Sequence, residues 1–155
     1  MAHHWSRICC PVDFSEPSWG ALVEAAGLAA RAGAVLSVLH VYDGAALIAT
    51  GDVMASVPEV EEKAVRETEQ RLERFKAEAE RIAPGKVTAE SLSGEAAGEI
   101  VRFAGRNDID LIVMATHGRT GIKRLVLGSV TERVVRQAPC SVLVVRPPRL
   151  GAGED

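Results

Sequence analysis

The sequence DLIVMATHG (residues 110–118), followed by nine residues and then by Gly128-Ser129, decides the fold and points to a site. Residues 110–115 form an apolar run typical of a buried strand, and a helix is expected to begin at Ser129, with its hydroxyl as the cap. Glycines in the two turns between this strand and this helix leave backbone N–H groups accessible, and a helix start favours negative charge. The pattern predicts that these turns hold a phosphate or another anion.

Basic residues gather around these turns. They are Arg119, Lys123, Arg124, Arg133 and Arg136, and Glu132 is the one carboxylate among them. We therefore expect a local field that attracts anions, although the chain has a net charge of −3. The sequence contains neither G-x-x-x-x-G-K-[ST] nor G-x-G-x-x-G after a strand, which excludes a Walker A loop and the dinucleotide fingerprint.

Strands and helices alternate along the rest of the chain. Strands are expected at 8–12, 34–42, 86–92, 110–115 and 141–145, and helices at 15–32, 59–83, 94–106 and 129–137, with Ser93 as the cap of the third helix. With right-handed crossovers, this alternation predicts an α/β fold, a single doubly wound sandwich in which four helices cover both faces of a five-stranded parallel sheet. The stretch from Asp43 to Pro58 has no firm period and is expected to be a loop.

The helix expected over 59–83 carries one apolar stripe, and the rest of its surface is charged. Glutamate precedes arginine by four residues at Glu62 and Arg66 and again at Glu67 and Arg71, a spacing that favours ion pairs of about 0.2 to 0.5 kcal/mol each. We interpret this charge as a solvated helix face and not as a binding patch.

With 155 residues, 47% of them hydrophobic, the chain is long enough for one packed core and too short for two ordinary domains. We assign residues 1–147 to one domain and 148–155 to a flexible C-terminal tail. No apolar run approaches the roughly 18 to 20 residues of a membrane span, and no signal-peptide segment is visible, so we expect a cytoplasmic protein without a membrane partner. The net charge gives no reason to expect nucleic acid. Cys9, Cys10 and Cys140 have no disulfide or zinc spacing and are expected to be buried free thiols.

The motif resembles that of the universal stress protein family, whose ATP-binding members carry G-x2-G-x9-G-[ST] at the end of their fourth strand. Gly118, the nine-residue spacer and Gly128-Ser129 are in register with this motif, and Ala115 replaces its first glycine. The resemblance extends from Arg7 to Arg146. It implies the strand order 3-2-1-4-5 and a ligand at the switch point between strands one and four.

The resemblance also implies partners. ATP is the expected cofactor, and Mg²⁺ or Mn²⁺ would be held by its phosphates and by water, so that no set of protein ligands is required. A homodimer through the last strand is implied as well, and the apolar run Val142 to Val145 has the chemistry for pairing at a sheet edge.

Family positions define the expected nucleotide site. Asp13 matches the aspartate near the ribose, and Val41 matches the position whose backbone meets the adenine edge. The expected set also contains Pro11, Val12, Met114, Ala115, His117, Gly118, Arg119, Gly128, Ser129, Val130 and Thr131. The methyl group of Ala115 is harmless if this residue keeps strand dihedrals, because only a positive φ or a very close contact demands glycine.

The expected function is that of an ATP-binding regulatory module of the stress response. Two alternatives stay open. A slow ATPase or phosphotransferase could use the same pocket, but His117 has no suitably spaced carboxylate or nucleophile and is expected to hydrogen-bond backbone or phosphate. A nucleotide-free structural or protein-binding dimer is the other alternative, and Ala115 is its only support.

Overall fold

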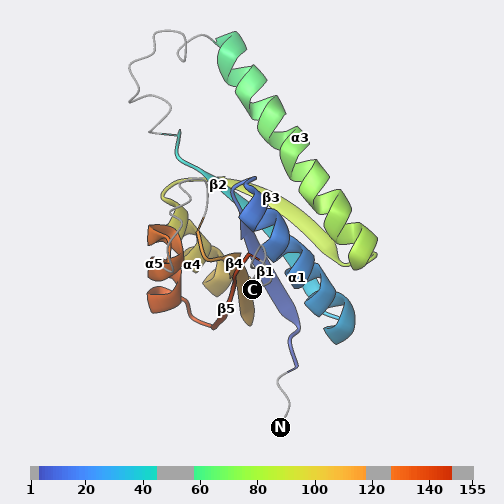
Figure 1. The fold of residues 1–155 in the computed structure, drawn as a ribbon. Helices are drawn as coiled ribbons and strands as arrows, with labels where there is room; N and C mark the ends of the chain where they lie inside the picture. The colour runs from blue at the N-terminus through green and yellow to red at the C-terminus, as the bar shows by residue number, and fades with distance from the viewer. Residues whose placement is uncertain (1–3, 45–57, 118–126, 148–155) are drawn as a thin grey trace, which may run out of the picture.

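Five parallel strands form the central sheet in the order β3-β2-β1-β4-β5 (Figure 1). The strands are β1 (Arg7–Val12), β2 (Val35–Tyr42), β3 (Val87–Ser93), β4 (Leu111–Ala115) and β5 (Ser141–Val145). This computed structural model describes residues 4–44, 58–117 and 127–147, so most of the loop expected between Asp43 and Pro58 and the expected tail lie outside the described residues. The strand order and the parallel pairing confirm the sequence prediction.

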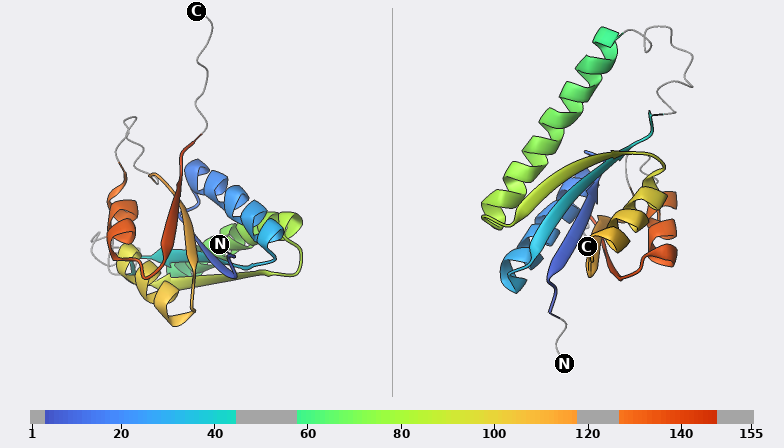
Figure 2. Two further views of the ribbon diagram at one scale, coloured as in Figure 1. Left: turned by 90° about the horizontal axis from the view of Figure 1, so that it is seen from below. Right: turned by 180° about the vertical axis from the view of Figure 1, so that it is seen from behind.

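Helices cover both faces of the sheet. Helices α1 (Glu16–Ala32) and α3 (Pro58–Ile82) lie on one face, and α4 (Ala96–Arg106) and α5 (Ser129–Gln137) lie on the other (Figure 2). The cap of α1 is Ser15, whose hydroxyl accepts a hydrogen bond from the N–H of Ser18, and α1 ends at Gly33 with a φ of 66°. The doubly wound architecture expected from the alternation of elements is therefore present.

Successive residues of the central strands face opposite helical layers, which explains why their sequences are apolar throughout. In β1, Ile8 and Cys10 belong to the core beneath α1 and α3, whereas Cys9 belongs to the core beneath α4 and α5. Burial raises the pKa of the Cys9 and Cys10 thiols, as expected for structural cysteines. Cys140 is half-buried and also free.

The structure corrects the expected starts of two helices. Ser93 does not cap α4, because it is the last residue of β3 and its backbone belongs to the strand. Gly94 then turns the chain at a φ of 148°, and Glu95 is the N-cap of α4. The N-cap of α5 is Gly128, so Ser129 is the first helical residue and its hydroxyl does not cap the helix.

Helix α3 reaches beyond the sheet at its N-terminal end (Figure 1). Leu72, Phe75 and Ala79, in its second half, are buried, whereas Val65 in the first half is 50% exposed. In the part of the chain that the structure describes, no helix has both the length and the apolar sequence needed to cross a membrane.

Candidate functional site

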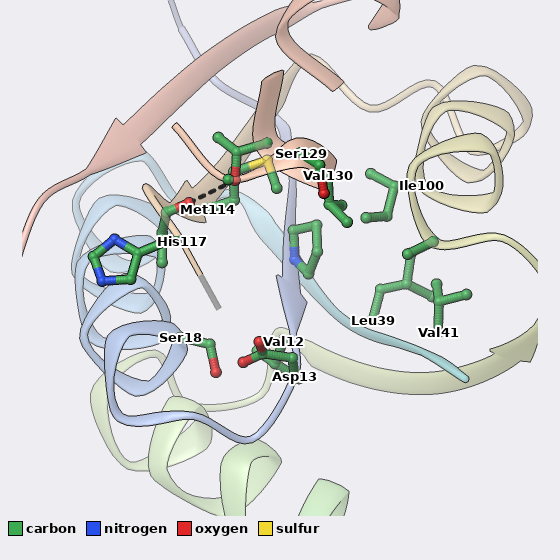
Figure 3. Close-up of a pocket in the computed structure, with 15 residues that line it drawn as sticks. Val12, Asp13, Ser18, Leu39, Val41, Ile100, Met114, His117, Ser129 and Val130 are labelled. Carbon is green, nitrogen blue, oxygen red and sulfur yellow. Dashed lines mark hydrogen bonds between the residues drawn. The ribbon is translucent and has the colours of Figure 1, made fainter. Parts of the chain in front are cut away.

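A cavity of about 210 Å³ lies at the carboxyl ends of β1 and β4 (Figure 3). Helices on opposite faces of the sheet follow these two neighbouring strands, and such a switch point is where open α/β sheets bind ligands. The lining includes the expected site residues Pro11, Val12, Asp13, Val41, Met114, Ala115, His117, Gly128, Ser129, Val130 and Thr131. Gly118 and Arg119 were also expected here and lie outside the described residues.

Asp13 is held on a short turn between β1 and α1. Its Oδ1 accepts hydrogen bonds from the N–H of Ser15, at 3.0 Å, and from the hydroxyl of Ser15. Ser18 lies beside Asp13 in the cavity wall, and its hydroxyl donates to the carbonyl of Ser15 at 3.0 Å (Figure 3). These contacts join the Asp13 carboxylate to the first turn of α1, so its position depends on that helix.

Ala115, which replaces the first glycine of the motif, is the last residue of β4 and pairs with Val145 of β5. Its φ is not positive, because among the described residues other than glycine only Phe14 and Asp108 have a positive φ. Ala115 therefore has the ordinary strand conformation that the sequence analysis required for a harmless substitution.

His117 follows β4 and lies on the side of the cavity opposite Ile100 (Figure 3). Its Nδ1 is 3.0 Å from the hydroxyl oxygen of Thr116. This contact is a hydrogen bond to a neighbouring side chain, whereas the expected partner was backbone or phosphate.

Helix α5 begins at the cavity with an N-cap, Gly128, that has no side chain to accept hydrogen bonds. The N–H of Gly128 donates to the carbonyl of Thr116 at 2.7 Å. Among the residues that the structure describes, the next three N–H groups, of Ser129, Val130 and Thr131, have no acceptor. Unpaired amides at the positive end of a helix dipole form a site for an anion.

Close packing explains the glycine at position 128. Its φ is −60°, so a left-handed conformation is not the reason. A Cβ added there would lie 3.3 Å from Cα of His117 and 3.5 Å from the carbonyl oxygen of Thr116. The buried hydroxyl of Thr131 donates to the carbonyl of Ala115 at 2.9 Å and thus fixes α5 against β4.

One side of the cavity is apolar, and most of its residues were not predicted from the sequence. Leu39 and Ile100 lie beside Val41 there, and Ala96 adds to the same lining (Figure 3). Leu39 pairs with Pro11 in the parallel register of β1 and β2. A register derived from the expected strand order could have identified Leu39, whereas Ile100 depends on how α4 packs.

Two of the basic residues that were expected to attract anions have carboxylate partners on the protein itself. Arg133 donates to Glu95 at 2.7 Å, and Arg136 donates to Glu132 at 2.7 Å. Both guanidinium groups are therefore paired with carboxylates and add little to an anion-attracting field. Arg119, Lys123 and Arg124, the remaining cations of that prediction, lie outside the described residues.

Comparison with known proteins identifies relatives along nearly the whole chain. Residues 4–146 match the model of the universal stress protein family. Universal stress protein MJ0531 of Methanocaldococcus jannaschii is 36% identical over 145 residues, which cover 94% of this chain and 84% of that protein.

Solved structures share the fold. Protein MJ0577 of the same organism superposes with a TM-score of 0.79 at 31% identity, over 94% of this chain and 98% of that one. A universal stress protein from Archaeoglobus fulgidus, solved in complex with dAMP, superposes with a TM-score of 0.67 over 92% of this chain and 98% of that one. At 21% identity, this second likeness concerns the fold alone.

Proposed function

The chain belongs to the universal stress protein family, and on this basis we propose that it binds ATP in the cavity between β1 and β4 as a nucleotide-dependent regulatory module. The observation that carries the proposal is the row of N–H groups at the start of α5 that have no acceptor among the described residues. A helix N-terminus with free amides, at the edge of a cavity, is a binding site for phosphate.

The two sides of the cavity suit the two ends of a nucleotide. The phosphates would accept hydrogen bonds from Ser129, Val130 and Thr131, and the adenine would pack against the apolar side formed by Leu39 and Ile100. Asp13, which lies across the cavity from Ser129 and Val130 in Figure 3, would accept hydrogen bonds from the ribose hydroxyls.

A divalent cation is compatible with this arrangement. Among the described residues, no group of three His, Cys, Asp or Glu side chains could hold a metal ion. Mg²⁺ or Mn²⁺ would therefore be carried by the phosphates and by water. The dAMP complex of the Archaeoglobus fulgidus relative supports an adenine nucleotide as the ligand class.

Nucleotide release tests the proposal. The purified protein is denatured, and the released small molecules are identified by mass spectrometry. Protein stripped of ligand is then titrated with ATP, AMP and GTP in a calorimeter, with Mg²⁺ present or chelated. We expect ATP to bind more tightly than GTP, because the apolar side has been assigned to adenine. The absence of both released nucleotide and binding heat at millimolar ATP would reject the proposal.

We further propose that β5 pairs with β5 of a second copy. It is an edge strand, and Leu143 is 41% exposed. Edge strands present unpaired backbone groups that another chain can complete. Leu143→Asp is expected to shift sedimentation from dimer to monomer, while Val135→Asp, at a 45% exposed position on α5, is not. A wild-type protein that sediments as a monomer at micromolar concentration would contradict the dimer.

A further inference from the structure

A second hollow lies on the other side of the turn that carries Asp13. It has a volume of about 340 Å³ and lies between the start of α1 and the middle of α3. We call it the aromatic groove, and its lining is Phe14, Ser15, Glu16, Trp19, Arg71, Arg74 and Phe75. None of these residues belongs to the proposed nucleotide site.

The floor of the aromatic groove is a cluster of three rings. Phe75 is buried, and its ring lies 5.4 Å from that of Phe14 and 4.8 Å from that of Trp19, both in edge-to-face geometry. Phe14 and Trp19 are only half-buried, so part of each ring is accessible from the groove. Such a floor can receive an aromatic or a large aliphatic side chain.

Two arginines of α3 line the rim of the aromatic groove. The sequence predicted that Arg71 pairs with Glu67, but in the described part of the chain neither Arg71 nor Arg74 has a carboxylate within ion-pair distance. The other two arginines of the helix do pair, Arg66 with Glu62 at 3.7 Å and Arg81 with a glutamate at 2.8 Å. Arg71 and Arg74 are both exposed, so their charges are available to a ligand.

The backbone at Phe14 is strained. Its φ is 64°, a left-handed value that bulky residues rarely adopt. Such strain persists where the surrounding structure enforces it, and it is frequent at functional sites. Here it directs the phenylalanine ring onto Phe75, at the floor of the groove.

We propose that the aromatic groove is a docking site for a short acidic segment of a partner protein, with an aromatic or aliphatic side chain among its carboxylates. The rim carries two guanidinium groups against the single carboxylate of Glu16, which complements negative charge. The apolar side chain packs onto the rings. A nucleic acid is a poorer occupant, because an extended polyanion would also meet the many glutamates along α3.

A peptide library tests this docking site. Fluorescein-labelled pentapeptides carry Asp or Glu at four positions and a varied central residue, and anisotropy is measured with the full chain at low salt. Members with central Phe, Trp or Leu are expected to bind more tightly than those with Ser. In the double variant R71E/R74E, the affinity of the best member is expected to fall at least about tenfold. R31E/R106E makes the same charge change at exposed ends of α1 and α4 and should leave the affinity unchanged.

Trp19 provides a second measurement at the groove itself. In a Trp5→Phe background Trp19 is the only tryptophan, and its emission should shift on saturation with the best peptide. Three results would overturn the proposal. The first is that no acidic peptide binds better than its counterpart with Lys and Arg, and the second is that peptide binding survives in R71E/R74E. The third is that inorganic phosphate competes with the peptide equally well, which would indicate a small-anion site. ATP titration of R71E/R74E is expected to match the wild type, so failure here is distinct from failure of the nucleotide proposal.

Discussion

Helices α4 and α5 both begin at the cavity, but their first turns are completed in opposite ways. At α4, the carboxylate of Glu95 accepts hydrogen bonds from the N–H groups of Ala97, at 3.2 Å, and Gly98, at 2.8 Å. At α5, the cap is Gly128, and no side chain in the described ranges accepts from the first turn. One helix start is closed by the protein's own anion, and the other is open to a foreign one.

The difference shows that a helix N-terminus is not an anion site by itself. Every helix start has unpaired N–H groups and a positive dipole end, and what matters is whether the cap residue uses them. Glu95 also accepts a hydrogen bond from Arg133 of α5 at 2.7 Å, so the carboxylate that closes α4 also connects the two helices. The open start of α5 is thus held beside a closed one.

The largest loss of ATP affinity is expected from giving α5 a carboxylate cap like that of α4. In Gly128→Asp, the new carboxylate would accept from the first-turn amides and repel phosphate. ATP affinity should fall by at least about a hundredfold in calorimetry, because charge-assisted hydrogen bonds to an anion contribute about 1.5 to 3 kcal/mol each. Gly128→Ala adds the Cβ without supplying an acceptor for the first-turn amides. If both variants lose the same affinity, the cause is the crowding of the Cβ against His117, at 3.3 Å, and not the carboxylate.

Removing one backbone N–H of α5 should lower the ATP affinity less. Ser129→Pro deletes the N–H at the first position of α5, where proline is well tolerated, and the ψ of 155° at Gly128 suits a residue before proline. The dissociation constant for ATP should rise about tenfold, since one such hydrogen bond is lost. Ser129→Ala keeps the N–H and removes only the exposed hydroxyl. An equal loss in the alanine variant would mean that the hydroxyl, and not the amide, binds the ligand.

Removing the carboxylate cap of α4 tests whether the first turn of that helix contributes to stability or to ATP binding. Glu95→Ala removes the cap, and the free energy of unfolding measured with urea should fall by about 1 kcal/mol. The affinity for ATP should change little, because the phosphates are assigned to α5.

Arg133→Ala is the control for Glu95→Ala. It removes only an ion pair whose side chains are 49% and 55% exposed, which is worth less than about 1 kcal/mol. A drop in ATP affinity for Glu95→Ala as large as that for Ser129→Pro would show that α4 takes part in binding.

The smallest effect is expected at Ala115, whose carbonyl holds Thr131 of α5. Ala115→Gly restores the glycine of the family motif, but Ala115 has no positive φ, so ATP affinity should stay the same. Thermal unfolding should report a loss of about 0.5 to 1 kcal/mol, because glycine in a strand costs backbone entropy. A clear gain in affinity would show that the methyl group obstructs the ligand.

The helix caps mark the limit of what local sequence could predict. Ser93 is a good capping residue, but strand pairing with β2 extends β3 through it, and pairing depends on a segment about 50 residues away in the sequence. At α5 the serine and the glycine before it both fit a helix start, and the cap is the glycine, which packs closely against His117.

The sequence also could not reliably predict which charged side chains form ion pairs. A spacing of four residues predicted Glu62 with Arg66 correctly and Glu67 with Arg71 incorrectly, although the two pairs look the same in the chain. Arg71 lines the aromatic groove, whereas Arg66 lies in the first half of α3. Weak pairs of this kind are decided by what each side chain finds around it.

The sequence alone determined the order of strands and helices, because buried strands and amphipathic helices leave different apolar periods along the chain. The family resemblance supplied the strand order, and with it the cavity edge where Asp13 and the start of α5 meet. Only the tertiary structure decided which amides and arginines lack a partner among the described residues, and which apolar residues complete the cavity. These properties depend on distances between segments that are remote in sequence, and no local pattern records such distances.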